Sequence, residues 1–333
     1  MEQQRHEQKV LTNIKLRGAR RRRWAERLLL RYRSNGVSVV TPPENAIRVI
    51  CISDTHNTQP AVPKGDILIH AGDLTENGSF DEVQQGLNWL SSQPHRYKIL
   101  VAGNHDVLLD EEFLEKYPER RYGETKGRCD LDWGDIIYLE NKQVTLDVPV
   151  KLIQHSSRME TSSENEVRRI TIFGSPLTPQ YGISAFQYRP DSAENTWERI
   201  LGSTSPKPDI IITHGPPRLH LDARDFHRAG CPHLAEHIAR IRPRLHVFGH
   251  IHACCGREDI VLDRVQRYYE DVMNQWAGWG AVLSLAWLVA WDLVARVLLR
   301  VRRDRGPITA FINASIVGGP QNEIRNRPVE IEI

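Results

Sequence analysis

Five short runs of β-branched and other apolar residues recur along this chain, and polar side chains able to bind a metal follow each of them. The runs are 48–53, 66–70, 98–101, 209–213 and 245–248. They alternate with helix-like patterns, which is typical of an α/β fold. Because the carboxyl ends of strands are where α/β sheets hold their ligands, we expect the five polar segments to meet at one place.

Two helices are predicted between these strands. Ser79 and Glu82 form an S-x-x-E capping box in front of the apolar stripe Val83, Leu87 and Leu90, so a helix is expected to begin there. A second helix is expected to begin at Pro232, because proline is favoured at the first helical position.

The polar segments offer carboxylate, amide and imidazole groups. They contain Asp54 and His56, then Asp73, then Asn104 and His105, then His214, and finally His250 and His252. Mixed oxygen and nitrogen donors suit manganese, iron or zinc better than magnesium or calcium, and the identity of the metal stays open. Because one carboxylate can bridge two cations, Asp73 is predicted to bridge. One divalent ion is expected at Asp54, His56, Asp73 and His252, and the other at Asp73, Asn104, His214 and His250.

A pair of ions about 3.5–4 Å apart suits phosphoester hydrolysis, because they clamp the attacking and leaving oxygens and hold a hydroxide nucleophile between them. His105 is surplus to the ligand count and is predicted to assist the leaving-group oxygen as a catalytic residue. Asp106 is interpreted either as the group that orients His105 or as a surface acid.

The motifs D-x-H, G-D, G-N-H-D, H and G-H-x-H together resemble the calcineurin-like metallophosphoesterase superfamily, and no ligand of that pattern is missing. Segments 65–73, 213–217, 242–252 and 313–315 are most similar to the group of metallophosphoesterase-domain brain proteins and their fungal and bacterial relatives, near the class III cyclic nucleotide phosphodiesterases. The resemblance covers about residues 46–260 and 307–333. It implies a four-layer α/β/β/α sandwich, in which two packed mixed sheets are flanked by helices and carry the dimetal site at their strand ends.

The resemblance also implies hydrolysis of phosphoesters, and the subgroup favours phosphodiesters. Two alternatives stay open. The first is a phosphomonoesterase, including a protein phosphatase, and the second is a membrane-surface scaffold that keeps the site but hydrolyses little.

Residues 1–45 are predicted to be a basic arm and linker. The first 35 residues hold eleven Arg or Lys and three Glu, a net charge of +8 in a chain whose total is +2. A membrane surface, a nucleic acid or a docking partner would fit such an arm, and so would a solvated tail. Nucleic acid is disfavoured as a partner, because the rest of the chain carries a net negative charge and its sequence shows no second basic surface. The sequence shows no secretory signal, and its five cysteines are an odd number that does not suit a framework of disulfides. We therefore expect a cytoplasmic location.

The phosphoesterase domain is expected at 46–333, interrupted by a hydrophobic helical insertion at 257–306. Residues 276–291 carry no charge and are rich in tryptophan, which is typical of interfacial segments. A bilayer span needs about 20 apolar residues. A single crossing would also separate the 313–315 segment from the metal motifs. We therefore expect a peripheral or monotopic helix in one leaflet, or else a helix packed on protein or on a second copy. The oligomeric state stays open.

Overall fold

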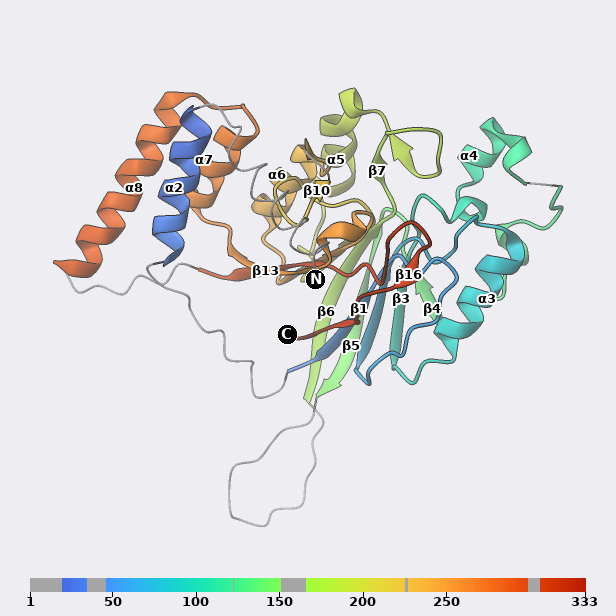
Figure 1. The fold of residues 1–333 in the computed structure, drawn as a ribbon. Coiled ribbons are helices and arrows are strands. Elements are labelled where there is room, and N and C mark those ends of the chain that lie inside the picture. The colour runs from blue at the N-terminus through green and yellow to red at the C-terminus, as the bar shows by residue number, and fades with distance from the viewer. Residues whose placement is uncertain (1–19, 35–45, 122, 151–165, 225–226, 299–305) are drawn as a thin grey trace, which may run out of the picture. The chain divides into compact units, whose positions relative to one another are not determined.

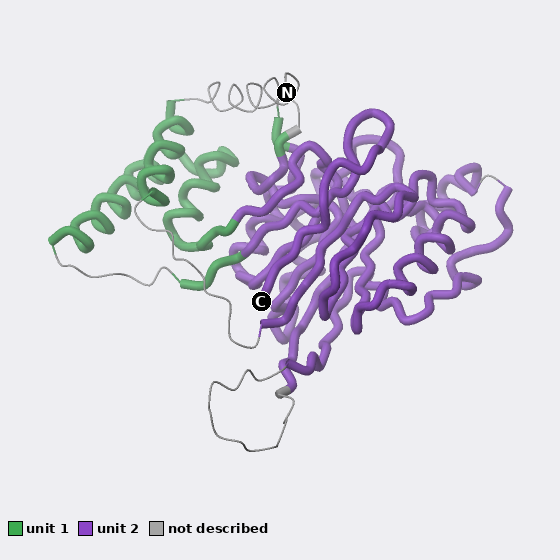
Figure 2. The backbone as a smooth tube through the Cα atoms, turned by 60° about the horizontal axis from the view of Figure 1, so that its bottom comes forward, with its two compact units in different colours: residues 1–41, 223–228, 259–309 green, residues 42–222, 229–258, 310–333 purple. Residues whose placement is uncertain are grey.

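The computed structural model describes residues 20–34, 46–121, 123–150, 166–224, 227–298 and 306–333. The chain divides into two compact units (Figure 2). One contains 42–222, 229–258 and 310–333, and the other contains 1–41, 223–228 and 259–309. Residues 1–19 and 35–45 of the predicted arm and linker, and residues 299–305 of the predicted insertion, lie outside the described residues.

Two mixed sheets form the framework (Figure 1). In the first sheet β1 to β4 run parallel and β17 runs antiparallel to β1. Its order is β17 (Val329–Glu332), β1 (Arg48–Ile52), β2 (Ile67–Ala71), β3 (Tyr97–Val101) and β4 (Ile136–Tyr138).

In the second sheet β14, β12, β9 and β6 run parallel and β5 runs antiparallel to β6. Its order is β13 (Gly256–Val261), β14 (Ile308–Asn313), β12 (Leu245–Phe248), β9 (Ile210–Thr213), β6 (Glu166–Ser175) and β5 (Lys142–Val150). The five strands predicted from the sequence are all present, each within one residue of its predicted ends.

Alternate residues of the two sheets pack against each other and form the main core, as the twofold periodicity of strands requires. This layer contains Val49, Cys51, Ile67 and Ile69 from the first sheet and Ile210, Ile212, Leu245 and Val247 from the second. The opposite face of the first sheet, with Ile50, Leu68 and Leu100, packs on Val83, Leu87 and Leu90 of α3 (Phe80–Ser91). The predicted capping box begins α3, with Ser79 Oγ accepting from Glu82 N and the Glu82 carboxylate accepting from Ser79 N.

Helices α5 (Ala193–Leu201) and α6 (Pro232–Ile241) pack together on the side of the second sheet (Figure 1). The predicted α/β/β/α arrangement is thereby confirmed. The remaining elements are short. They are α4 (Glu111–Lys116) and the strand pairs β7 (Thr178–Pro179) with β8 (Gln187–Tyr188), β10 (Ala223–Arg224) with β11 (His227–Arg228), and β15 (Val317–Gly318) with β16 (Glu323–Ile324).

The smaller unit is a cluster of three helices, α2 (Arg20–Ser34), α7 (Arg264–Met273) and α8 (Trp279–Val297). Their shared core contains Ala25, Leu29, Val265, Val272, Val282, Leu285 and Val289. The Tyr32 hydroxyl donates a 2.5 Å hydrogen bond to Asp263, whose other oxygen caps α7 at Gln266 N. Helix α2 of the basic arm and helices α7 and α8 of the hydrophobic insertion therefore share one core. Residues 257–261 of the predicted insertion lie in β13 instead of in a helix.

Candidate metal centre

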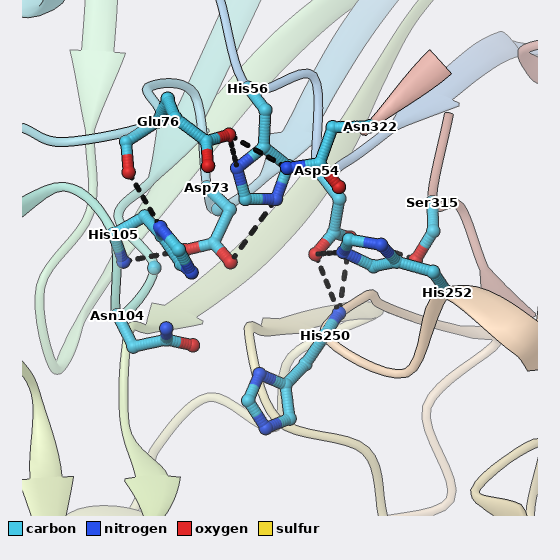
Figure 3. Close-up of polar contacts among 12 residues, drawn as sticks. Asp54, His56, Asp73, Glu76, Asn104, His105, His250, His252, Ser315 and Asn322 are labelled. Carbon is cyan, nitrogen blue, oxygen red and sulfur yellow. Dashed lines mark hydrogen bonds and ion pairs between the residues drawn. The ribbon is translucent and has the colours of Figure 1, made fainter. Parts of the chain in front are cut away.

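The predicted ligands lie directly after the ends of β1, β2, β3, β9 and β12, in the larger unit (Figure 3). Asp54, His56, Asp73 and His250 have φ of 51°, 43°, 53° and 67°, a left-handed conformation that is uncommon for such residues. A backbone this unusual persists only where the surroundings impose it. This left-handed conformation turns the backbone sharply after each strand and brings these side chains together.

The glycines of the motifs have a steric role. A Cβ on Gly249 would collide with the carboxylate of Asp54, and a Cβ on Gly103 would collide with that of Asp73. Only glycine therefore lets the G-H-x-H and G-N-H segments approach the two aspartates so closely.

Asp54, His56 and His252 form the first cluster, and their ligand atoms all lie within 4.8 Å of one another. His252 Nε2 lies 3.1 Å from Asp54 Oδ1, and the backbone N–H of His250 donates to both Asp54 oxygens at 3.0 Å. Burial raises the pKa of Asp54, but the hydrogen bond from His252 and the nearby imidazoles outweigh burial and hold that pKa well below its usual range. The carboxylate is therefore available to a cation in its charged form.

Asp73, His214 and His250 form the second cluster. His214 Nε2 lies 3.2 Å from Asp73 Oδ2 and 3.1 Å from Asn104 Oδ1, so Asn104 belongs to this cluster too. His214 Nδ1 donates to the Ala71 carbonyl at 2.9 Å, which leaves Nε2 as the ligand atom. In the metal-free protein, burial opposes the protonation of His214, but Asp73 and Asp54 raise its pKa to about 9. Burial lowers the pKa of His250 to about 3, so its imidazole is neutral.

Asp73 belongs to the second cluster and also lies near His56 of the first. Its Oδ2 is 3.2 Å from His214 Nε2 and 3.8 Å from His56 Nε2. Burial raises the pKa of this carboxyl, but His214 and His105 lower it well below its usual range. A charged carboxylate with one imidazole of each cluster beside it is the geometry expected of the predicted bridge.

The donor set fits a divalent metal centre. His56 Nε2 is buried and has no hydrogen-bond partner among the described residues, although buried polar atoms are normally satisfied. This nitrogen faces Asp73 at 3.8 Å, and Asp54 and His252 complete its cluster. A cation held by these groups would satisfy it, and two carboxylates, one amide and four imidazoles are the ligand types that borderline divalent metals prefer.

Residues 47–254 match the family model described as Calcineurin-like phosphoesterase. The chain belongs to the calcineurin-like phosphoesterase family. It is 37% identical over 224 residues to human Metallophosphoesterase domain-containing protein 1, covering 64% of this chain and 63% of the human one. It is 34% identical over 221 residues to a UPF0046 protein of Caenorhabditis elegans, covering 64% of this chain and 67% of that protein. The expected resemblance to the metallophosphoesterase-domain group is thus confirmed.

A longer relative comes from Emericella nidulans and is named "Probable rhamnogalacturonate lyase C". The identity is 39% over 294 residues, which is 87% of this chain but 25% of that protein. The phosphoesterase chain therefore spans a quarter of the length of this relative and 63% of the length of the human one.

His105 lies beside the two clusters, with its ring centroid 4.7 Å from that of His56. Its backbone N–H donates to Asp73 Oδ1 at 2.8 Å, and its Nδ1 lies 2.6 Å from the carbonyl oxygen of Glu76. Because a carbonyl can only accept, Nδ1 carries the hydrogen. Nε2 is then the ring nitrogen that would serve the predicted role at the leaving group, and that role stays a prediction.

Asp106 has neither of the roles considered from the sequence. Its side chain is fully buried and accepts hydrogen bonds from the backbone of Gly103 (2.8 Å), Leu74 (3.2 Å) and Thr75 (2.9 Å) and from the Thr75 hydroxyl (2.8 Å). Its carboxylate contacts the main chain of two loops, one at Leu74 and Thr75 and the other at Gly103, instead of the His105 ring. Asp106 therefore joins the loop that carries Asp73 to the loop that carries Asn104.

Sequence reasoning missed two residues that hold ligands in place. Glu76 Oε2 lies 3.0 Å from His56 Nδ1 and accepts from Asn322 Nδ2 at 2.7 Å (Figure 3). Ser315 Oγ lies 2.8 Å from Asp54 Oδ2. The only sequence signal for Ser315 is that the 313–315 segment resembles the family, and Glu76 has no such signal.

A pocket of about 440 Å³ has none of the predicted metal ligands in its lining. It is linked to them through Ser184, a lining residue whose hydroxyl donates to the Asn104 backbone carbonyl at 2.7 Å. The lining contains both acids and bases, namely Asp110, Glu111, Glu112, Glu140, Lys116, Arg128 and Arg199.

Proposed function

We propose that this chain is a metal-dependent phosphoester hydrolase with a dinuclear centre, and that phosphodiesters are its substrates. The observation that carries the proposal is the position of Asp73, which shares a cluster with His214, His250 and Asn104 and lies 3.8 Å from His56 in the cluster of Asp54, His56 and His252. Two sets of ligands around one shared carboxylate are what a pair of cations needs. Membership of the phosphoesterase family supports the same chemistry.

The predicted ligands form two sets that share Asp73. Asp54, His56, Asp73 and His252 would hold one divalent ion, and Asp73, Asn104, His214 and His250 the other. When bound, such ions supply Lewis acidity and lower the pKa of water. Manganese, iron and zinc match the nitrogen-containing donor set.

His105 has the geometry of a general acid toward the leaving group. Its Nδ1–H donates to the Glu76 carbonyl, which restrains the ring and leaves Nε2 as the nitrogen that would carry the transferable proton. A proton on Nε2 would pass to the leaving oxygen as the ester bond breaks.

The resemblance to a subgroup supports a diester, because the segments at 65–73, 213–217 and 242–252 resemble a subgroup close to the cyclic nucleotide phosphodiesterases.

The test is hydrolysis of bis-aryl phosphate and of mono-aryl phosphate by the purified chain, after chelation and readdition of manganese. We expect metal-dependent turnover of the bis-aryl ester and loss of turnover in Asp73→Asn. Asp81→Asn is the matched control, because Asp81 is an exposed carboxylate on α3.

Turnover of the mono-aryl ester alone would instead show a phosphomonoesterase. Folded, metal-loaded protein that hydrolyses neither ester would favour the scaffold. Full activity with one bound ion per chain would contradict the dinuclear centre.

A further inference from the structure

Helix α8 is apolar on two opposite faces. One face, with Val282, Leu285 and Val289, is buried in the core of the helical unit. The other face is exposed and carries an apolar residue every three or four positions, which we name the tryptophan stripe: Trp279, Leu283, Trp287, Trp291, Val294 and Leu298. Leu283 is 69% exposed and Trp287 is 65% exposed. A continuous apolar stripe open to water is uncommon in a soluble protein and marks an interaction surface.

The tryptophan stripe contains no charge. The two charged residues of α8 are Asp292 and Arg296, and they pair with each other at 2.9 Å. Asp292 is buried, and the side chain of Arg296 is 24% exposed. Because the charges lie away from the stripe, nothing on it opposes burial in an apolar medium.

Arginines are exposed on the other two helices of the unit. On α2 an exposed row contains Arg20, Trp24, Arg27 and Arg31, with the Arg27 guanidinium 5.9 Å from the Trp24 ring centroid. On α7, Arg264 and Arg267 are exposed. The acidic residues of the three helices are buried or half-buried, namely Glu26, Glu270, Asp271 and Asp292. The exposed charge of these helices is therefore positive.

We propose that the helical unit binds the surface of an anionic phospholipid membrane. The tryptophan stripe enters the boundary between headgroups and acyl chains, where an indole places its ring in apolar surroundings and its N–H in polar ones. The exposed arginines contact lipid phosphates. An apolar face combined with basic residues is the pattern of helices that lie in the interface.

The fold favours α8 lying parallel to the membrane. By length and composition alone α8 is sufficient for a span, with a mean hydropathy of 1.6. However, β13 precedes the helices α7 and α8, β14 follows them, and both strands lie next to each other in one sheet. A single crossing by α8 would place these neighbouring strands on opposite sides of the bilayer. A second copy that paired its own tryptophan stripe with this one would add another set of exposed arginines and no exposed acidic residue from α2, α7 or α8.

The test is cosedimentation of the full chain with vesicles of phosphatidylcholine alone and of phosphatidylcholine with phosphatidylserine. We expect binding to the mixed vesicles, weakened by salt, and little binding to phosphatidylcholine. Replacing Leu283, Trp287 and Trp291 together by Ser should weaken partitioning by roughly tenfold or more, because the buried apolar area is lost. Arg20→Gln and Arg27→Gln should each weaken it by roughly fivefold on anionic vesicles.

Val167→Ser is the matched control, because Val167 is 56% exposed on β6 in the other unit and should leave binding unchanged. Circular dichroism checks that each variant keeps its helices. Two outcomes would overturn the proposal. One is equal binding by the wild type and the triple variant, or no binding by either. The other is a wild-type dimer that becomes a monomer in the triple variant, since the stripe would then be an interface between two copies.

Discussion

The hydroxyl oxygen of Ser315 lies 2.8 Å from Oδ2 of Asp54, a residue 261 positions earlier in the chain. The neighbouring backbone reinforces the contact, because Ile316 N donates to Ser53 O at 2.8 Å and Val317 N donates to Asp54 O at 3.2 Å. The segment that follows β14 in the second sheet thereby holds the ligand that follows β1 in the first. The position of the Asp54 carboxylate depends on both sheets.

Ser315→Ala should weaken metal binding by about 10–100-fold, because residues that hold a ligand have effects of that size. Metal affinity is measured by titrating the chelated protein. Ser92→Ala is the control, since among the described residues the Ser92 hydroxyl bonds to the Trp89 carbonyl and the Gln93 amide, which lie on α3 and the turn after it. Equal affinities in both variants would show that Asp54 needs no support from Ser315.

Glu76→Ala should lower metal affinity by about tenfold, because His56 would lose the partner of its Nδ1 and its ring would be free to turn. Glu76→Gln keeps an oxygen at that position and should lose less. The comparison of Ala with Gln, with the exposed Glu111→Gln as control, is made by the same metal titration. The reverse order of the two variants would contradict this role.

His105→Gln should lower kcat by about 10²–10⁴-fold with an alkyl leaving group and much less with a nitrophenolate, which needs no proton. Bound metal should stay unchanged, because His105 is placed outside both ligand sets. Metal content and kcat for the two esters check this, and exposed His227→Gln is the control. A loss of the same size with both leaving groups would argue against proton donation.

Asp106→Asn should destabilise the protein by about 2–3 kcal/mol. The new amide turns two donor hydrogens toward a site where backbone N–H groups already donate, so buried donors are left unsatisfied. Chemical denaturation measures the change. The exposed Asp81→Asn should stay within about 0.5 kcal/mol of the wild type. If Asp106→Asn unfolded at the same denaturant midpoint as the wild type, the hydrogen bonds of this carboxylate would not contribute to stability.

Metal should stabilise the folded chain against heat, because the clusters exist only when the strand ends are assembled. A divalent ion at a hundredfold excess over its Kd should add about 2.7 kcal/mol. Thermal unfolding of the chelated protein with and without manganese measures this. The Asp73→Asn variant should respond less, and an identical response in both proteins would place the stabilising ion elsewhere.

Much of the fold was determined by local sequence. Runs of β-branched and other apolar residues predicted each of the five strands within one residue, because strands buried on both faces leave short continuous apolar runs in the sequence. The capping box of α3 was equally local, since Ser79 and Glu82 satisfy each other's backbone. The candidate ligands could be chosen from the sequence as well, because each follows a strand directly and their types are those that bind metal, and the structure brings them together after the strand ends.

Tertiary structure alone decided which residues support those ligands. Ser315 contacts Asp54 across the two sheets, and Asp106 contacts two loops through its carboxylate, so neither pairing has a spacing that a sequence pattern would show. The packing of α2 against α7 and α8 is of the same kind. An apolar stripe in the sequence predicts that a helix buries one face. Which segments pack against that face is decided by the complementarity of shape among segments that are distant in the chain.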